Sequence, residues 1–458
     1  ALPTAAEVQA TLLNINNIQG DILFGMKKNM ETFLFFSIAN STLFKQKLRA
    51  DIKSRVTSTA QLLSVSSQPV TALNVAFLQA GLNALGVIDD LSDFVFSGGQ
   101  ESDAGELGDP GTINWVPAFK GSQIHGVFLL ASDTSANLNS FVSEFTAIVQ
   151  DSIHQIYRLD GAARPGAQAG HEHFGFMDGI SQPAIDGFNK ALPGQESIPP
   201  GIILLGEERD SNSTSRPDWA KGGSFLAFRQ LAQKVPEFNQ YLVENAIVAP
   251  GLTREQGSEL LGARMVGRWK SGAPIDLAPK FDDPVLARDP NRNNNFTFAH
   301  PDEDIISDQT RCPFSAHIRK TKPRADSGSS VNVVNQIIRA GIPYGPEVTR
   351  QEATSKKTIQ ERGLAFVAYQ SAIGDGFQFL QQAWANQPLF PFGKSDRTPG
   401  YDPIVGANSG QTRFVSGLDP NDANHDYTME TDFVVSRGGE YFFSPPISAL
   451  SDVLSVGA

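Results

Sequence analysis

The strongest constraint on the fold is a pattern of an apolar strand followed by a helix, which occurs twice in each half of the chain. In the first half, strands are expected at 31–38 and 125–131, with helices at 41–52 and 137–149. In the second half, strands are expected at 222–228 and 363–369, with helices at 235–246 and 376–386. The helices are predicted because apolar side chains recur every three to four residues, as at Leu138, Phe141 and Phe145.

The two halves also resemble each other loosely in sequence. The segment METFLFFSIANSTLFKQKL corresponds to GGSFLAFRQLAQKVPEFNQYL, and HGVFLLASDTSANLNSFV corresponds to RGLAFVAYQSAIGDGFQFL. This correspondence predicts a duplicated α+β unit with helices packed on an antiparallel sheet, with chance similarity between strand–helix pairs as the alternative. We expect an N-terminal unit at 1–165, a connecting segment at 166–220 and a C-terminal unit at 221–458.

Composition excludes several classes of protein. No apolar run reaches the ~18–20 residues needed to span a bilayer. The net charge of −12 argues against a nucleic-acid partner, because phosphate binding needs a basic surface. Cys312 is the only cysteine, so an intramolecular disulfide or a cysteine-rich metal site is excluded.

Two features favour a secreted protein over an intracellular one. The sequence begins at Ala1 without an initiator methionine, as a processed chain does. Three glycosylation sequons begin at Asn40, Asn212 and Asn295, although the sequence does not show which of them are used.

The pair His171 and His173 is a first candidate for a metal site. On a strand the two imidazoles would share one face, because side chains alternate. A zinc or copper site needs a third ligand, however, and no HExxH spacing is present. A hydrogen-bonded structural pair is therefore the favoured interpretation, and a metal-dependent hydrolase is the alternative function.

The neighbouring segment Gly175-Phe-Met-Asp178-Gly179 places an acid between glycines. Such glycines let the backbone turn tightly and expose the carboxylate to a ligand, although most Asp-Gly pairs are plain turns. The longer stretch GHEHFGFMDGISQPAI resembles the signature of the dye-decolorising haem peroxidases, whose acid lies above the haem. The resemblance extends through NNIQGDIL, WAKGGSFLAFRQL, GARMVGRWKSGAPI, DQTRCPFSAHIRKTKPR and IIRAGIPYGP, and the fungal, extracellular branch fits best.

The resemblance implies a fold of two ferredoxin-like units that form a dimeric α+β barrel, with haem in the C-terminal half. It implies one haem b per chain, with His317 as the ligand of the iron. A ligating imidazole gains basicity when its other nitrogen donates to a carboxylate. Asp402, in GYDPIVG, is the expected partner, and a plain turn role is the alternative for it. Arg319, two residues beyond His317, is a candidate partner for a haem propionate.

On the opposite side of the haem, the resemblance assigns Asp178 as the acid–base group and Arg339 as its cationic neighbour. A positioned base can take one proton from hydrogen peroxide and return it to the leaving oxygen. The permanent charge of Arg339 would stabilise negative charge as the O–O bond breaks. Leu364 and Phe366 match apolar residues that line the same side, and plain core packing is the alternative for both.

The expected substrates are hydrogen peroxide, anthraquinone and azo dyes, and phenolic aromatic compounds such as lignin fragments. Bulky dyes cannot reach a buried haem, and Trp384 and Tyr344 match the surface positions that relay electrons in fungal relatives. Trp384 could instead be core, because it shares a helical face with Phe377 and Leu380.

A non-catalytic haem carrier is a further alternative. No nucleic acid, membrane or obligate protein partner is expected. The physiological substrate, manganese oxidation and oligomeric state are not determined by the sequence.

Overall fold

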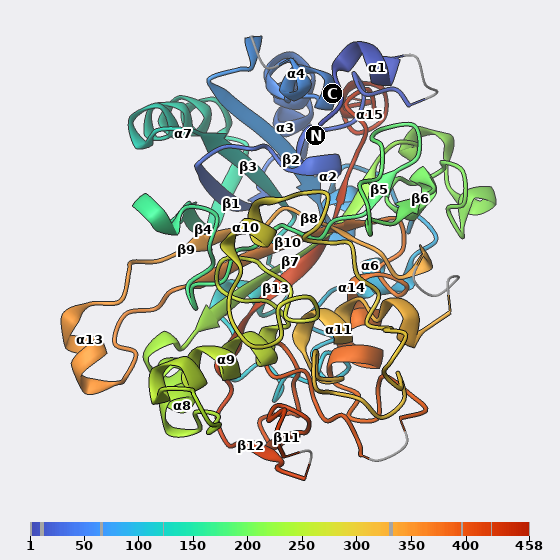
Figure 1. Ribbon diagram of the computed structural model, residues 1–458. Coiled ribbons are helices and arrows are strands. Elements are labelled where there is room, and N and C mark those ends of the chain that lie inside the picture. Colours follow the sequence, from blue (N-terminus) through green and yellow to red (C-terminus); the bar gives the residue numbers. More distant parts are fainter. Residues whose placement is uncertain are drawn as a thin grey trace.

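The computed structural model describes residues 2–9, 13–64, 67–121, 123–328, 333–394, 397–422 and 424–457. Its centre is a closed barrel of eight strands in the order β7-β13-β2-β3-β1-β4-β9-β10, in which β10 pairs back to β7 and also carries β8. Figure 1 shows β1 to β4 in the upper part and β7, β10 and β13 crossing the middle. No helix among the described residues is long and apolar enough to cross a membrane.

The barrel is built from two blocks with the same strand order. The N-terminal block runs β4-β1-β3-β2, and its strands are Met30–Ile38 (β1), Thr71–Phe77 (β2), Gly126–Ser132 (β3) and Ile153–Ala162 (β4). The C-terminal block runs β13-β7-β10-β9, and its strands are Ser224–Gln233 (β7), Ile342–Tyr344 (β9), Gly363–Gln370 (β10) and Val434–Ser444 (β13), with Ile338–Arg339 (β8) attached. β1 corresponds to β7 and β3 to β10, so the duplication predicted from the sequence is confirmed. The residue boundaries of the predicted units stay a prediction.

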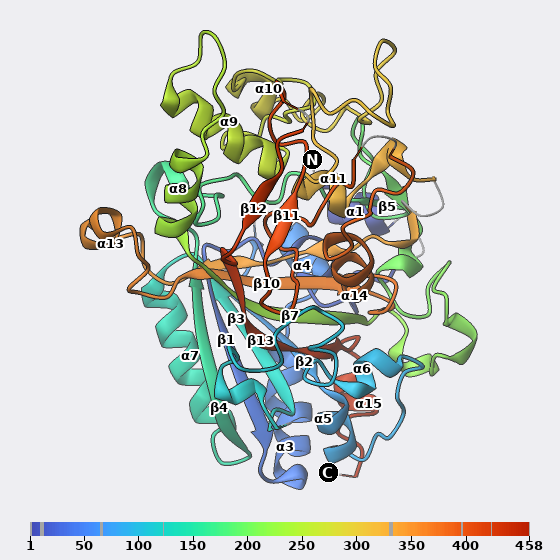
Figure 2. The same cartoon turned by 90° about the horizontal axis from the view of Figure 1, so that it is seen from below.

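Helices occur in both halves of the chain. The helices of the N-terminal half are Ala5–Gln9 (α1), Asp21–Phe24 (α2), Ser41–Lys47 (α3), Thr59–Leu63 (α4), Gln79–Ala84 (α5), Phe94–Gly98 (α6) and Ser135–Val149 (α7). Those of the C-terminal half are Val235–Glu244 (α8), Arg254–Val266 (α9), Pro284–Arg288 (α10), His317–Thr321 (α11), Arg350–Ser355 (α13), Phe377–Phe379 (α14) and Ala449–Asp452 (α15). Figures 1 and 2 show α8, α9 and α11 on one side of β7 and β10, with α3 and α7 on the other.

Two of the predicted helices are shorter as α-helix than their apolar spacing indicated. The helix expected at 41–52 continues after α3 as a π-helix, Leu48–Ile52 (η1), and the helix expected at 376–386 is α14 followed by the π-helix Leu380–Ala385 (η10). A π-helix has more residues per turn, and such segments are frequent at functional sites. Phe377 belongs to one apolar cluster, whereas Leu380 and Trp384 belong to another.

Strand alternation sorts side chains between the barrel interior and its outside. In β1, Phe33 and Phe35 are buried in the interior, whereas Leu34 and Phe36 pack against the outer helices. In β10, Ala365 fills the same interior cluster, so its neighbours Leu364 and Phe366 face outward. The outer face of β10 is therefore available to form the wall of a site.

Two small sheets lie outside the barrel. The parallel pair is Ala184–Ile185 (β5) with Ser197–Ile198 (β6), and the antiparallel pair is Arg413–Val415 (β11) with Tyr427–Met429 (β12). Most of the backbone around them lacks regular structure, as the Gly- and Pro-rich composition of 161–215 predicts.

Candidate active site

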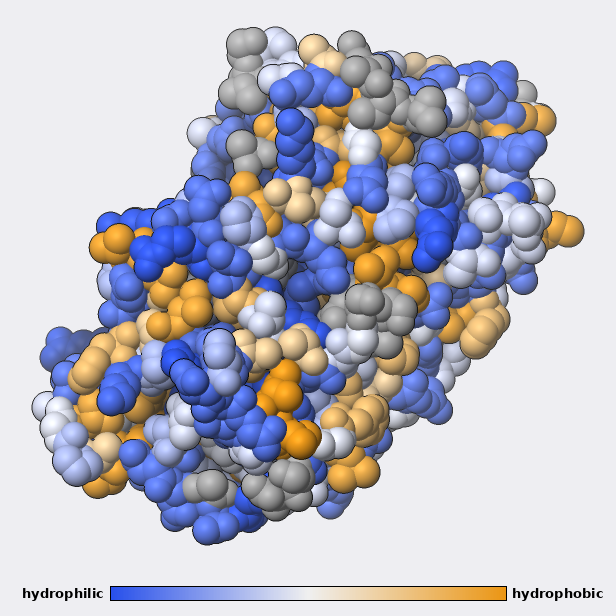
Figure 3. All heavy atoms as spheres, turned by 45° about the vertical axis from the view of Figure 1, so that its right-hand side comes forward, coloured by the Kyte–Doolittle hydropathy of each residue, from blue (hydrophilic) through white to orange (hydrophobic). Residues whose placement is uncertain are grey.

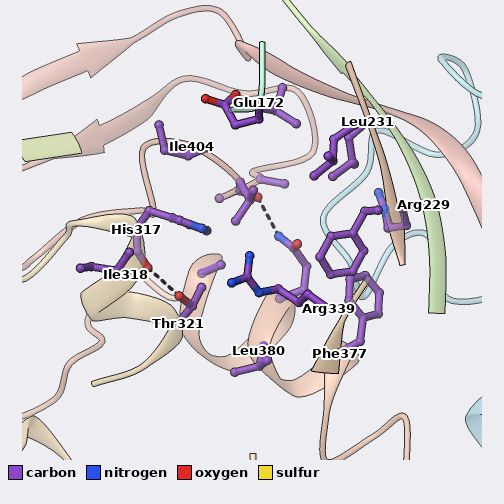
Figure 4. Close-up of a pocket in the computed structure, with 18 of the residues that line it drawn as sticks. Glu172, Arg229, Leu231, His317, Ile318, Thr321, Arg339, Phe377, Leu380 and Ile404 are labelled. Carbon is purple, nitrogen blue, oxygen red and sulfur yellow. Dashed lines mark hydrogen bonds between the residues drawn. The ribbon is translucent and has the colours of Figure 1, made fainter. Parts of the chain in front are cut away.

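A cavity of about 310 Å³ lies between the outer face of β7 and β10 and the segments that contain α11 and η10. Apolar side chains form much of its wall, among them Leu231, Ile318, Leu364, Phe366, Phe377 and Leu380. Figure 4 shows the imidazole of His317 and the guanidinium of Arg339 pointing into the same space, with Arg229 and Leu231 on the wall away from His317. An apolar cavity with a few convergent polar groups is the usual form of a ligand site.

His317 begins α11, and one of its ring nitrogens is already engaged. Its Nδ1 lies 2.7 Å from Oδ2 of Asp402. Nε2 is then the nitrogen that remains for a ligand in the cavity, which His317 lines. Burial acts to lower the pKa of His317, but the Asp402 carboxylate more than compensates and the net pKa is raised. The imidazole is therefore oriented and made more basic, as a metal ligand requires.

Asp402 is fixed in place from both of its oxygens. Its side chain is fully buried; Oδ2 accepts from His317, and Oδ1 accepts from the backbone N–H groups of Ile404 and Val405 at 2.8 and 3.0 Å. Burial acts to raise the pKa of this carboxyl, but His317 and these N–H donors hold it below its usual value. The structure thus pairs the two residues that the sequence predicted to be partners.

Asp178 lies in a turn whose shape depends on the neighbouring glycines. Gly175 and Gly179 have φ values of +97° and +75°, a region that favours glycine. The turn is anchored by Asp178 N–H donating to Gly170 O at 2.9 Å and by Met177 N–H donating to Lys270 O at 3.1 Å. The glycines of the motif therefore serve to hold an acid at the cavity.

Arg339 and Asp178 form an ion pair that lines the cavity. Arg339 Nη1 donates to Asp178 Oδ1 at 2.7 Å, and the N–H of Gly179 donates to the same oxygen at 2.6 Å. Arg339 Nη2 donates to Ser181 O at 3.1 Å, and the backbone N–H and C=O of Arg339 are hydrogen-bonded to the side-chain amide of Gln182. Burial acts to raise the pKa of Asp178, but the charge and hydrogen bond of Arg339, the hydrogen bond from Gly179 and the charge of His317 together outweigh it, and the net pKa is lowered. Asp178 is thus an ionised carboxylate with side-chain surface exposed toward the cavity.

Leu364 and Phe366 both line this cavity from β10. Their cross-strand neighbours on β7 are Leu231 and Arg229. Phe366 also packs against Phe377, with ring centroids 5.7 Å apart. The two residues therefore narrow the space beside Arg339.

Two arginines that motif reading did not single out line the cavity and present positive charge to it. Arg268 donates to the uncharged oxygens Gly272 O, Asn293 O and Asn294 Oδ1. Arg324 donates to the carbonyls of Gly194, Asn294 and Phe296, and both guanidinium groups lie over the Phe296 ring. Burial, together with the charges of Arg324 and Arg339, lowers the pKa of Arg268 to about 9, so it is still cationic at neutral pH. The only sequence indication of Arg268 as a site residue is its place in the segment GARMVGRWKSGAPI.

These features fit the expected haem. An oriented imidazole suits the iron, apolar walls suit the porphyrin ring, and the cations suit its two carboxylates. The residues that would hold the group are therefore His317, Arg268 and Arg324, together with the apolar wall.

Arg319 is not where the sequence placed it. Its side chain is 2% exposed and is absent from the wall of the cavity; Nε and Nη2 form a two-point ion pair with Asp326, and Nη1 donates to Cys312 O. The expectation that Arg319 binds a propionate is therefore wrong for this structure, because its donors are used inside the protein.

Trp384 and Tyr344 are also not surface residues. Trp384 is 3% exposed because the ring of Phe390 covers it, at a centroid distance of 5.0 Å and an interplanar angle of 6°. Tyr344 is 5% exposed, and its hydroxyl donates to Glu361 Oε1 at 2.9 Å. Neither side chain lines the cavity, although Leu380 and Ala385 of η10, which flank Trp384, do.

His171 forms an isolated β-bridge with Met177 and His173 lies in a turn, so the two do not share one strand. His173 is buried and its Nε2 lies 2.9 Å from Tyr344 O, whereas His171 Nδ1 lies 3.3 Å from Ala169 O. Burial lowers the pKa of His173 to about 4, which keeps it neutral. Within the described ranges, no three His, Cys, Asp or Glu side chains are arranged to hold a metal ion. Nothing in this geometry favours the hydrolase alternative.

Comparisons with known proteins give one answer for both halves. The family described as "DyP dimeric alpha+beta barrel domain" matches residues 17–165, and "Dyp-type peroxidase, C-terminal" matches residues 174–408. The chain is 58% identical to Peroxidase 2 of Mycetinis scorodonius, over 99% of this chain and 91% of that protein. It is 54% identical to a dye-decolorizing peroxidase of Auricularia auricula-judae, over 99% of this chain and 89% of that protein. A crystal structure of a decolorizing peroxidase from Auricularia auricula-judae superposes with a TM-score of 0.94 at 53% identity, covering 97% of this chain and all of that one.

Proposed function

The chain belongs to the dye-decolorising peroxidase family and is a haem peroxidase, and on this premise we propose a specific role for each polar group of its cavity. The observation that carries the proposal is that His317 and the Asp178–Arg339 pair reach one cavity from different elements, α11 on one side and the glycine turn and β8 on the other. One group can hold the iron while the other two act on peroxide.

We assign one haem b per chain to this cavity, where His317 would bind its iron. When bound, the haem supplies the redox centre at which peroxide is reduced. Asp402 fixes the ring of His317 and its tautomer, because its Oδ2 holds Nδ1. Arg268 and Arg324 are assigned to the propionates because they line the cavity with positive charge.

Asp178 is assigned as the group that moves the proton of hydrogen peroxide. Its carboxylate is kept ionised by Arg339, so it can accept a proton from one peroxide oxygen and deliver it to the other. Arg339 stabilises the negative charge on the departing oxygen with a guanidinium that is already in place. Over a full cycle, one peroxide and two molecules of a substrate AH give two waters and two radicals A•.

The proposed reducing substrates are anthraquinone and azo dyes and phenolic compounds. Leu364 and Phe366 narrow the cavity, so a polycyclic dye is expected to give up its electron outside it. We assign Trp384 as the relay, because η10 carries both Trp384 and cavity-lining residues and a large indole can lose one electron. Tyr344 is a second candidate, because Glu361 is positioned to accept its phenolic proton.

The activity is tested by an absorbance spectrum and a dye assay on the purified protein. Haem absorption in the Soret region, together with bleaching of an anthraquinone dye only after addition of peroxide, is the expected result. Haem absorption without bleaching would identify a haem carrier and contradict the proposed catalysis.

The relay is tested by Trp384→Ser with one anthraquinone dye and one small phenol. We expect most of the dye turnover to be lost while phenol oxidation and the reaction with peroxide are retained, since Trp384 does not line the cavity. Tyr344→Phe keeps the ring and removes the phenolic proton, so it serves as the comparison. Equal losses on both substrates, with a lower Tm, would instead make Trp384 a residue of structural importance only.

We also propose that the protein is secreted. Asn40 and Asn295 are exposed, whereas the amide of Asn212 is half-buried and donates to Ser92 O at 3.2 Å. Asn40 and Asn295 are therefore the sequons expected to carry glycans, and mass spectrometry of protein from the culture medium tests this.

A further inference from the structure

Trp384 belongs to a small apolar cluster that runs outward from the wall of the cavity. The cluster buries Leu380, Trp384 and Phe390, with Ile337 and Phe379 packed against it. Leu380 and Ile337 also line the cavity. One continuous set of side-chain contacts therefore leads from the haem cavity to the relay residue.

Beyond Trp384 the cluster continues to the surface as a series of aromatic rings. The Phe390 ring is stacked on Trp384, and its centroid lies 5.4 Å from that of Phe392 at an interplanar angle of 78°. Phe392 is 62% exposed and Leu389 is 56% exposed. The series of rings therefore reaches solvent at Phe392, although Trp384 itself is buried.

Lys320 holds the outer segment against α11. Its side chain is buried, and Nζ donates to Trp384 O at 3.3 Å, to Gln387 O at 2.7 Å and to Phe390 O at 2.6 Å. Three hydrogen bonds from one ammonium group tie the two sides of the Trp384–Phe390 stack together. The exposed pair Leu389 and Phe392 is therefore presented on a fixed segment.

We propose that Leu389 and Phe392 form the docking platform for large planar aromatic substrates of this peroxidase. The proposal rests on the assigned role of Trp384 as the relay. It adds the surface at which a substrate binds next to that relay. A docked aromatic gives one electron to oxidised Trp384, which is restored, and the aromatic leaves as a radical. Phe390 and Phe392 are not oxidised in this step; they fill the gap between the substrate and the indole.

The size and chemistry of the platform favour a small aromatic molecule as its occupant. A stable protein interface buries ~800 Å² on each partner, far more than two side chains provide. On the face shown in Figure 3, apolar residues form small groups separated by hydrophilic ones. A planar fused-ring molecule can pack on an exposed phenyl ring in an offset or edge-to-face arrangement. The ring series to Trp384 then explains why an exposed phenylalanine lies at this position.

The experiment compares the haem-loaded wild type with a Leu389→Ala/Phe392→Ala variant. The probes are an anthraquinone sulfonate dye, which is large and planar, and 2,6-dimethoxyphenol, which is small. We expect the Kd of the dye without peroxide, and its KM in turnover, to rise about 10-fold, with kcat for the dye and all constants for the phenol unchanged. The Phe392→Tyr variant keeps a ring at this position. It should therefore have the wild-type Kd and KM for the dye.

Phe94→Ala is the matched control, because Phe94 is 84% exposed and lies outside the Trp384 cluster. This variant should bind and oxidise the dye like the wild type. Unchanged Kd and KM in the double variant, with dye turnover lost in Trp384→Ser, would place the docking site elsewhere and leave the relay intact. A raised Kd with an unchanged KM for the dye would also overturn the proposal, because the platform would then not be on the route of the electron. Dye turnover that survives in Trp384→Ser would instead contradict the relay, and the Kd would still report separately whether the dye docks here.

Discussion

Asp402 and Asp178 both serve the cavity, but their surroundings differ. Asp402 is fully buried, with His317 on one oxygen and two backbone N–H groups on the other. Asp178 has 35% of its side-chain surface exposed, and both hydrogen bonds that its carboxylate accepts from described residues, from Arg339 and Gly179, go to Oδ1.

These surroundings distinguish a carboxylate that positions another side chain from a carboxylate that reacts. A side chain whose oxygens are both occupied cannot take up a peroxide proton without losing a hydrogen bond, whereas Asp178 lines the cavity and its Oδ2 accepts no hydrogen bond from the described residues. In both cases a neighbouring positive or protonatable group lowers the pKa against the effect of burial. Exposure and free hydrogen-bonding capacity, and not the pKa, distinguish the two roles.

The largest expected effect comes from removing the reactive carboxylate. Asp178→Asn should slow the reaction with peroxide by at least ~100-fold, the usual scale of a general base, while haem content stays normal. Stopped-flow absorbance measures this rate, as the rate at which the first oxidised state of the haem forms after peroxide is added. A wild-type rate in Asp178→Asn would mean that another group moves the proton and that the distinction drawn above is wrong.

Removing the positioning carboxylate should give a smaller effect of a different kind. Asp402→Asn should weaken haem retention or activity by roughly 10-fold, because partners of a metal ligand typically contribute 10- to 100-fold. The Soret spectrum should also change, since the imidazole loses its charged partner. An Asp402→Asn protein with unchanged spectrum and haem affinity would show that His317 needs no such partner.

The charge of Arg339 should also set the pH dependence of the peroxide reaction. Because Arg339 lowers the pKa of Asp178, the ionised base should persist below the ordinary carboxyl pKa of ~3.9, and dye oxidation should be fastest at acidic pH. Arg339→Leu removes that charge, leaving burial to raise the pKa of Asp178. The acid limb of the peroxide reaction should then move upward by about one pH unit or more.

Rates measured across pH values from acidic to neutral in Arg339→Leu and in Arg339→Lys, which keeps the charge, test this shift. An acid limb at the same pH in wild type and Arg339→Leu would show that the charge of Arg339 does not set the titration of the base.

Local sequence pattern predicted the parts of the molecule that depend on local or repeated signals. The strand–helix repeat gave the two blocks of the barrel, and the glycines around Asp178 indicated a turn that exposes an acid. The exposure of Trp384 was mispredicted because Phe390, from outside its helix, folds back over the indole and is held there by Lys320. Arg319 was mispredicted because its ion pair with Asp326 forms only after the chain turns, and no residue spacing encodes that direction.

Haem absorbance per chain in His317→Ala tests whether His317 binds the haem in this cavity. His300→Ala is the matched control, because His300 also pairs with a carboxylate, Asp276 at 3.1 Å, but does not line the cavity. We predict that His317→Ala loses stable haem while His300→Ala keeps the wild-type Soret band. Full haem content with an unchanged spectrum in His317→Ala would contradict the assignment, and loss of haem in His300→Ala would transfer it to that residue.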